Sequence, residues 1–299
     1  MTDSPWWKSS RHADRRPFLA ARAAIVRALR EWFWARDFVE VEPQALAASP
    51  GAETHVHAFE ARGLYLHTSP EFAMKKLLAA GESKVFFLGK CWRQGETGPL
   101  HAEEFTMLEW YRAEAPYDLI MDDCVELARL AARTAGATHL RWRDETCDPF
   151  GAAQKRKVAE LVAPGLAGDA FSAAIVGVEP QLGSPRLTLL YEYPVSEAAL
   201  ARRCLHDNGL AERFEMYACG VELANGFGEL TDPAEQRTRL EEAMSEKAKR
   251  YGAAWPIDEE FLAALAHMPP ASGVALGLDR LVMLATGARH IRDVLWTPP

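Results

Sequence analysis

CWRQGETGPLHAEEFTMLEWYR, residues 91–112, is the stretch of sequence that decides the fold. An apolar run ends at Arg93, a loop rich in glycine and polar residues follows, and the chain then returns with a two-residue alternation. The two runs and their loop predict a pair of adjacent strands. On the second strand the alternation places on one face Phe105, Met107, Glu109 and Tyr111. A carboxylate among aromatic side chains raises the question of what its partner is.

The composition bounds the class of protein. The chain has 299 residues, enough for one large domain or two small ones, and its 48% hydrophobic and 25% charged residues are ordinary for a globular protein. A net charge of −8 argues against binding nucleic acid through a basic surface, although a nucleotide needs only a local cluster. No apolar run approaches the ~20 residues of a membrane span, and no signal-type core is present, so we expect a cytoplasmic protein.

The cysteines and histidines form no metal-site or disulfide pattern. The five cysteines make no CxxC pair and no even set, which indicates free thiols in a reducing compartment. His55 and His57 form an HxH pair without a third ligand nearby, and we interpret them as exposed structural residues. The sequence also lacks the glycine loops of P-loop and dinucleotide-binding folds and the motifs of common hydrolases.

Apolar spacing predicts an α+β domain over residues 18–299 behind a polar tail of residues 1–17. Strand-like segments come in adjacent pairs with helical segments between them, which favours an antiparallel sheet over a doubly wound parallel one. Ser69 is the expected N-cap of a helix that starts at Pro70. The expected helices are 18–37, 68–81, 117–135, 233–250 and the second half of 272–287; the expected strands are 38–43, 84–93, 103–112, RLTLLYEYP, the hairpin 213–230 and the start of 272–287.

The hairpin brings two glutamates together. With a two-residue turn at 219–220, Tyr217 pairs with Glu222 and Glu215 pairs with Ala224. Glu215 and Glu222 then project from the same face, where Mg²⁺ with phosphate oxygens would relieve their repulsion. A solvated sheet face with two unrelated glutamates is the alternative.

Two arginines stand where a phosphate would suit them. Arg93 lies on a rigid strand at the loop, a place that fits charge developing on a phosphoryl group, although a surface salt bridge is the usual role of a single arginine. Arg280 falls in the first turn of a helix after Gly273 and Gly277. A cation there opposes the helix dipole, so its placement indicates an anionic ligand.

These motifs together resemble class II aminoacyl-tRNA synthetases of the lysyl type. The string from Arg93 to Tyr111 is similar to their motif 2, and GVELANGFGELTDPAEQ (220–236) is similar to their lysine-pocket hairpin. GVALGLDRLVML (273–284) resembles motif 3, and the helix and strand ending at Pro43 resemble motif 1. The resemblance implies an antiparallel sheet flanked by helices, AMP-forming ligation with ATP and Mg²⁺, and a homodimer joined through motif 1.

The sequence has no room before motif 1 for the anticodon-binding OB domain of a lysyl-tRNA synthetase. In this it resembles the truncated relatives that adenylate (R)-β-lysine and transfer it to a lysine of elongation factor P, so the expected acceptor is that protein rather than tRNA. Ala275 agrees, because lysyl-tRNA synthetases usually have glycine there. Two alternatives stay open: an enzyme that aminoacylates tRNA, and a non-catalytic synthetase paralogue that acts as a regulator. The choice between β-lysine and α-lysine also stays open.

The resemblance also implies residue roles. Arg93 and Arg280 would be the catalytic residues, Phe105 and Arg280 would enclose adenine, and Glu215 and Glu222 would hold Mg²⁺. The full expected ATP site comprises Arg93, Gln94, Gly95, Glu96, His101, Phe105, Glu222, Leu223, Gly277 and Arg280. The expected amino-acid site comprises Ser69, Pro70, Glu71, Glu109, Tyr111, Asn225, Glu229 and Ala275.

Three features depart from the family pattern. Gly95 stands where family members commonly have a glutamate for the adenine amino group, and Ala102 stands where they have an asparagine. In addition, Asn225 and Glu229 have the opposite parity to Glu222, so an undistorted strand would send them to the other face. A β-bulge near Gly226 or Gly228 would reconcile this.

Overall fold

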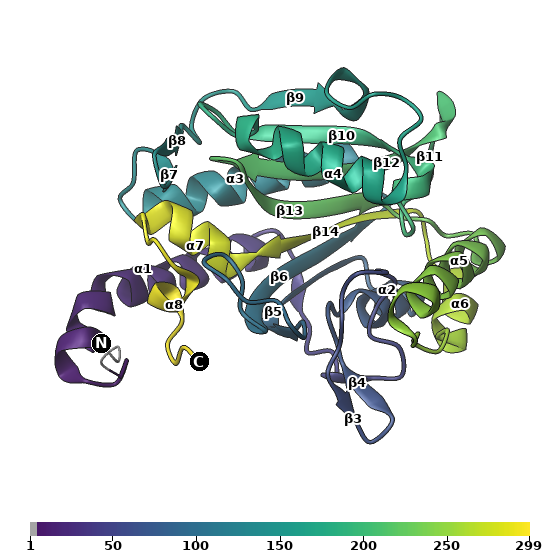
Figure 1. Cartoon of the computed structure of the whole chain (residues 1–299), viewed down its shortest axis with the longest axis horizontal. Helices are drawn as coiled ribbons and strands as arrows, with labels where there is room; N and C mark the ends of the chain where they lie inside the picture. Colours follow the sequence, from purple (N-terminus) through teal and green to yellow (C-terminus); the bar gives the residue numbers. More distant parts are fainter. Residues whose placement is uncertain (1–4) are drawn as a thin grey trace.

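A computed structural model describes residues 5–299. It contains a nine-stranded, mostly antiparallel sheet with the order β1-β5-β6-β14-β13-β12-β10-β9, and β11 pairs with β12 beside this path (Figure 1). The predicted α+β class is therefore confirmed. The strands are β1 (Val39–Glu40), β5 (Lys84–Trp92), β6 (Glu104–Ala113), β9 (Gln154–Lys157), β10 (Thr188–Pro194), β11 (Arg203–Cys204), β12 (Asp207–Ala218), β13 (Val221–Gly228) and β14 (Ala271–Gly277).

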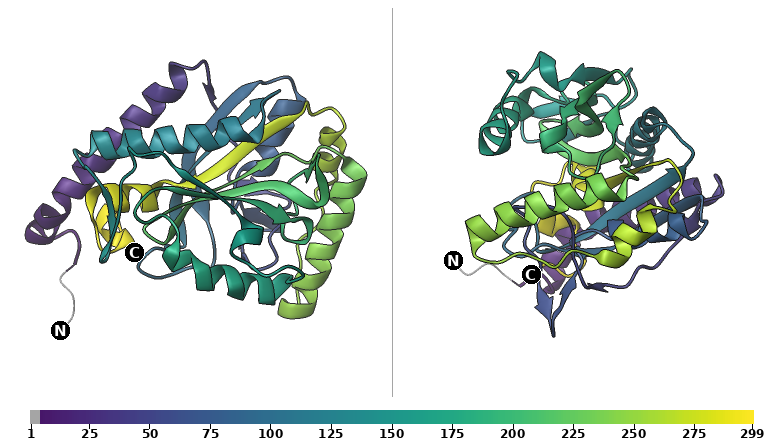
Figure 2. Two further views of the ribbon diagram at one scale, coloured as in Figure 1. Left: turned by 90° about the horizontal axis from the view of Figure 1, so that it is seen from above. Right: turned by 90° about the vertical axis from the view of Figure 1, so that its right-hand side faces the viewer.

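Helices cover the sheet in two groups (Figures 1 and 2). On one face α1, α3 and α7 contact one another over a core that includes Leu108 and Trp110 of β6. On the other face α2 and α6 pack over a second core, which includes Met107 and Tyr111 of the same strand. The alternation read from the sequence of β6 thus separates two cores. The helices are α1 (Ser9–Trp34), α2 (Glu71–Ala79), α3 (Tyr117–Thr134), α4 (Gly168–Val178), α5 (Pro233–Tyr251), α6 (Glu259–Leu265), α7 (Leu278–Thr286) and α8 (Ile291–Val294).

Small strands stand outside the main sheet. A three-stranded sheet contains β2 (Leu46–Ala47), β4 (Leu64–Leu66) and β3 (Glu60–Ala61), and a two-stranded one contains β7 (Leu140–Trp142) and β8 (Glu145–Cys147). The loop that joins β2 to β3 reaches the predicted ATP-binding residues, as described below.

Element boundaries differ from the sequence prediction at several places, and β12 begins at Asp207, before the expected hairpin start at 213. Helix α1 begins at Ser9, inside the segment expected to be a tail, and it includes Pro17. The expected strand 38–43 is only β1, which pairs in parallel with β5. Helix α2 starts at Glu71, so Pro70 rather than Ser69 takes the N-cap position, although the Ser69 hydroxyl still accepts a hydrogen bond from the Glu71 N–H (3.1 Å).

The β12–β13 hairpin contains the expected bulge at an unexpected position. Tyr217 pairs with Glu222 as predicted, but Met216 pairs with Ala224, so Leu223 is the extra residue. Glu215 consequently pairs with Asn225 and not with Ala224. Because one added residue reverses the parity of all that follow, Asn225 lies on the same face as Glu215 and Glu222. The predicted bulge at Gly226 or Gly228 is wrong in position.

Candidate active site

One cross-strand row connects the predicted amino-acid and metal residues. Glu109 of β6 pairs with Ala275 of β14, Ala275 pairs with Asn225 of β13, and Asn225 pairs with Glu215 of β12. Directly paired residues share a face of the sheet and lie about 5 Å apart. Four residues predicted from three separate motifs therefore line up on one surface. Asn225 Oδ1 is buried there without a hydrogen bond from the described part of the chain.

Glu109 is held by two hydroxyl groups at one end of this row. Ser69 Oγ donates to Glu109 Oε2 (2.7 Å), and Tyr111 Oη donates to Oε1 (2.8 Å). The side chain is buried, and no ion pair within the described residues neutralises it. Burial and the charge of Glu71 raise the pKa of Glu109 to about 8.

A buried lysine that sequence reasoning missed lies beside it. Lys75 of α2 has a 1% exposed surface, and its Nζ lies 2.5 Å from Glu71 Oε1 and 2.6 Å from Glu229 Oε2. Burial lowers the pKa of Lys75, but Glu229 and Glu71 outweigh it and raise the pKa, so the ammonium stays charged. The i,i+4 spacing from Glu71 was the available signal, but this spacing is common on exposed helix faces.

The charges of this pocket do not balance. Glu71 and Glu229 pair with the single ammonium of Lys75 and Glu109 pairs with none, which leaves the cluster a formal charge of −2 when all three carboxylates are ionised. Burial raises the pKa of Glu229 to about 7 and also raises that of Glu71, because the charged forms lack compensation. A ligand with two ammonium groups would supply the missing charge. A neutral or monocationic ligand would leave a buried carboxylate unpaired.

Arg93 directly follows Trp92, the last residue of β5, where the loop to β6 begins. Its guanidinium stands 5.3 Å from the ring centroid of Phe105 and donates through Nε to the Thr68 carbonyl (3.4 Å). Two carboxylates face it at longer range, Glu53 at 4.0 Å and Glu96 at 3.9 Å. These loose pairs leave guanidinium hydrogens available for an anionic ligand.

Arg280 is positioned by its neighbour on α7. The buried carboxylate of Asp279 pairs with Arg22 of α1 and accepts the Thr106 N–H of β6 (2.7 Å), which fixes the start of α7. The Arg280 guanidinium then points away from that core. It donates to the Glu222 carbonyl (2.9 Å) and to His101 Nε2 (2.5 Å).

His101 accepts this bond as a neutral ring. Burial and the charge of Arg280 lower the pKa of His101, which favours the neutral ring, and because a guanidinium can only donate, Nε2 is the acceptor. The contact places the β5–β6 loop against the start of α7. It thereby brings together two expected ATP-binding residues that lie far apart in the sequence.

Glu215 and Glu222 fit a divalent cation unequally. Glu215 already accepts the hydroxyls of Tyr193 (2.6 Å) and Tyr217 and pairs with Arg213 (2.5 Å). Among residues 5–299 the Glu222 carboxylate pairs only with Arg280, at 4.0 Å, and burial together with the charge of Glu215 raises the pKa of Glu222 to about 7. No group of three or more His, Cys, Asp or Glu side chains among residues 5–299 could hold a metal alone. A cation bound here would take its other ligands from phosphate oxygens, which suits Mg²⁺.

The other expected ATP-binding residues lie in the β5–β6 loop and the hairpin. The backbone N–H of Gln94 donates to the His57 carbonyl (2.7 Å), and that of Gly95 donates to Glu103 Oε1 (2.8 Å). Both backbone N–H groups are therefore hydrogen-bonded within the protein. The Leu223 side chain is buried in the core under α3 and α7, which leaves only its backbone for a nucleotide. Gly277 ends β14 directly before α7.

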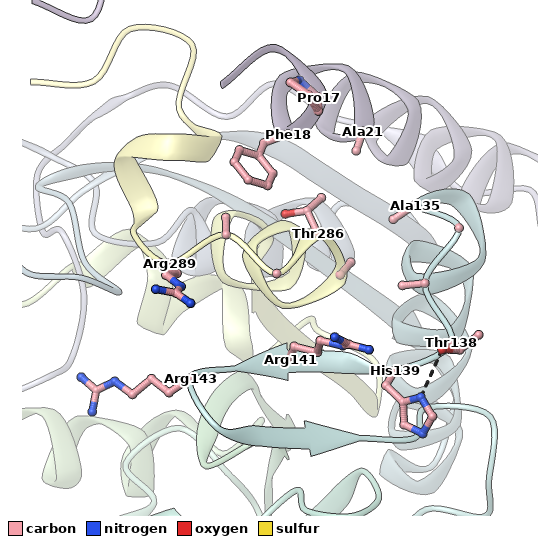
Figure 3. Close-up of a pocket in the computed structure, with 15 residues that line it drawn as sticks. Pro17, Phe18, Ala21, Ala135, Thr138, His139, Arg141, Arg143, Thr286 and Arg289 are labelled. Atoms are coloured by element: carbon pink, nitrogen blue, oxygen red, sulfur yellow. Dashed lines mark hydrogen bonds between the residues drawn. The ribbon is translucent and has the colours of Figure 1, made fainter. Parts of the chain in front are cut away.

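A separate cavity lies at another end of the molecule. It has a volume of about 640 Å³ and opens between α1, the ends of α3 and α7, and β7 (Figure 3). Arg141, Arg143 and Arg289 line it together with His139. It contains none of the residues predicted for ATP or the amino acid.

No helix in residues 5–299 is long and apolar enough to cross a membrane.

The fold and these motifs define a class II synthetase. The chain matches the family described as tRNA synthetases class II (D, K and N) over residues 4–299, and it belongs to this family. Curated relatives named elongation factor P–(R)-beta-lysine ligase cover nearly the whole chain. The relative from Salmonella arizonae is 39% identical (99% of this chain, 98% of the relative), that from Vibrio cholerae 37% (100% and 99%), and that from Hamiltonella defensa 36% (100% and 99%).

Proposed function

We propose that this protein adenylates (R)-β-lysine with ATP and transfers it to a lysine side chain of elongation factor P. The names of the relatives support this acceptor and this amino acid. The single observation that carries it is the formal charge of −2 among Glu71, Glu109, Glu229 and Lys75. This charge matches the two ammonium groups of a diamino acid, whose carboxylate stays free to react.

In the first step an oxygen of the amino-acid carboxylate attacks the α-phosphorus of ATP in line. The new P–O bond forms as the bond to the bridging oxygen breaks, and pyrophosphate leaves with the electron pair. Arg93 neutralises the charge that develops on the α-phosphate and steadies the attacking carboxylate, and Arg280 holds the nucleotide on the opposite side. Mg²⁺, held by Glu222 and Glu215, would neutralise the phosphate oxygens.

In the second step the acceptor amine attacks the acyl carbon of the adenylate and AMP leaves. This amine must be neutral to attack, so the lysine ammonium first loses one proton. Its nitrogen loses a second proton to solvent as the amide forms, and AMP leaves with the electron pair of the broken C–O bond. The protein needs no covalent nucleophile for either step. The work is positioning and electrostatic stabilisation by residues on rigid strands and at a helix start.

Isotope exchange between pyrophosphate and ATP tests this function. We expect exchange with (R)-β-lysine above that with (S)-α-lysine, and a mass increase of one β-lysyl group on a single lysine of elongation factor P. Labelled lysine on tRNA instead would favour the tRNA-aminoacylating alternative. Absence of exchange with every lysine isomer would favour the non-catalytic paralogue.

The role of Arg93 has its own control. Arg93→Ala should abolish exchange while the circular dichroism spectrum and melting temperature stay unchanged, because the side chain makes only loose contacts. Arg141→Ala, an exposed arginine at the separate cavity, should leave exchange at the wild-type rate. Near-normal exchange in Arg93→Ala refutes the proposed catalytic role.

A homodimer joined through α1 and β1 is also part of the proposal. Strand β1 is at the edge of the main sheet, and beside it Trp34 and Val39 are 52% and 50% exposed. Apolar side chains at an unpaired sheet edge suit a two-fold interface. Light scattering should report twice the 33.2 kDa chain mass.

We further propose that the enzyme acts in the cytoplasm, where elongation factor P is used.

A further inference from the structure

Helix α5 contains a buried lysine that the reaction does not use. Lys247 is 2% exposed, and its Nζ donates to the carbonyls of Thr54 (2.9 Å) and Val56 (2.5 Å). The ammonium also stands 4.0 Å from the ring centroid of Trp255. No carboxylate within residues 5–299 makes an ion pair with it. Because a buried ammonium is costly without partners, the two carbonyls and the indole face are what compensate it.

Both carbonyls belong to the loop between β2 and β3, and we call residues 53–57 of it the anchored loop. Helix α5 holds this loop at further points. The Thr54 hydroxyl donates to the Ala243 carbonyl (3.4 Å), and His55 Nδ1 is hydrogen-bonded to Tyr251 Oη (2.8 Å). The His57 ring meets the Tyr251 ring edge to face at 4.6 Å. The HxH pair is therefore part of the loop's attachment to α5.

The other side of the anchored loop faces the catalytic arginine. Glu53 Oε1 lies 4.0 Å from the Arg93 guanidinium, and the His57 carbonyl accepts the Gln94 N–H (2.7 Å). These two contacts flank the point where β5 gives way to the loop of the predicted ATP site. A continuous series of contacts thus runs from Lys247 through the anchored loop to Arg93 and Gln94.

We propose that Lys247 is a positioning residue for ATP: it fixes the anchored loop, and the loop fixes Arg93 and Gln94 for contact with the α-phosphate. This inference rests on the proposed function, because it assumes that Arg93 meets ATP. Lys247 touches neither substrate. Replacing Lys247 is expected to weaken the binding of ATP and not that of the amino acid. The carboxylates of the amino-acid pocket lie elsewhere, on α2, on β6 and just after β13.

Lys247→Met, which keeps the length and apolar stem, tests the proposal. Hydrogen bonds to a charged group contribute about 1.5–3 kcal/mol, so we expect the KM for ATP in pyrophosphate exchange to rise on the order of 10- to 100-fold. The KM for β-lysine should stay within about twofold. Hydrogen–deuterium exchange should accelerate in residues 50–58. Lys249→Met, on the same helix with a 72% exposed side chain, is the matched control and should change none of these values.

A double variant separates positioning from simple packing. If Lys247 acts through the loop that carries Glu53, the effects of Lys247→Met and Glu53→Gln on the KM for ATP will be less than additive. Additive effects, an unchanged KM for ATP, or an equal rise in both KM values overturns the inference. If the wild-type protein shows no exchange with any lysine isomer, the proposed function fails instead. Hydrogen–deuterium exchange of residues 50–58 then still tests whether Lys247 holds the anchored loop in place.

Discussion

Replacing Glu109 by glutamine should make the protein more stable and less active at the same time. Glu109 is 1% exposed and has no ion pair among residues 5–299, so ionising it without a substrate ammonium costs free energy. Glutamine has the same shape, and its amide oxygen can accept from the Ser69 or the Tyr111 hydroxyl. The substitution therefore removes the charge and keeps the packing.

The raised pKa of Glu109 sets how much stability the glutamine variant gains over the wild type. The ordinary pKa of 4.5 becomes about 8 in the folded protein, so folding takes up a proton between these pH values. The stability that the protonated carboxyl gives is fully present below pH 4.5 and is lost as pH rises through about 8. At about 1.4 kcal/mol per pH unit, the loss reaches roughly 3 kcal/mol at pH 7 and about 5 kcal/mol above pH 8. Glutamine does not titrate, so the stability of the variant does not fall in this way as pH rises.

Urea denaturation at pH 5, 7 and 8.5 measures the difference. We expect the free energy of unfolding of Glu109→Gln to exceed that of the wild type by less than about 1 kcal/mol at pH 5 and by an increasing margin at pH 7 and 8.5. Added β-lysine should raise the wild-type midpoint and leave the variant unchanged, and pyrophosphate exchange should fall by at least 100-fold in the variant. Equal stability of the two proteins at pH 8.5, or a variant that still activates β-lysine, would refute the reasoning.

The remaining predictions concern three other positions. Gly273→Ala places a methyl group against the Tyr111 ring, so the KM for the amino acid should rise and the stability should fall by about 1–3 kcal/mol. Gly177→Ala is the control, because its methyl group meets open space on α4, and it should not lower the melting temperature. Glu222→Gln should raise the Mg²⁺ concentration for half-maximal exchange on the order of tenfold in a metal titration; an unchanged midpoint removes Glu222 from the cation site. Lys75→Met leaves two buried carboxylates without their ammonium and should cost about 3–5 kcal/mol in urea denaturation at pH 8, and a neutral outcome would contradict the charge count of the pocket.

Local patterns were enough to predict the main elements of the fold. Strand β6, helix α3, hairpin β12–β13 and the β14–α7 pair all appear at the expected residues, because each has a clear period and a defined turn. The start of α1 at Ser9 was missed because residues 1–17 are polar and were assigned to a tail, and the helix continues through Pro17. Arg15, buried against the Leu295 carbonyl, gives that first part of α1 a tertiary contact that no local pattern shows.

The composition of the site was predictable, but its balance of charge was not. Ser69 and Tyr111, both members of the predicted set, donate hydrogen bonds to Glu109. Lys75 was absent from that set because an i,i+4 pair on a helix gives no sign of burial, and burial here depends on Glu229, 154 positions away along the chain. The roles assigned to these residues in binding remain predictions, and the geometry is what makes them testable.

The Leu223 bulge places the expected metal ligands and the expected amino-acid ligands on one face of the sheet. Without it, β13 would present Glu222 on one face and Asn225 on the other, so the expected metal ligand and the expected amino-acid ligand could not belong to one site. With it, the row Glu109–Ala275–Asn225–Glu215 runs on a single surface from the carboxylate proposed to bind a substrate ammonium to the one proposed to bind Mg²⁺. Ala275 stands in the middle of that row, so its methyl group occupies space that a glycine would leave between Glu109 and Asn225. A substrate whose amino group is moved by one carbon along its chain meets this methyl group at a different place, which gives a physical reason for a single side chain to influence the choice between α- and β-amino acids.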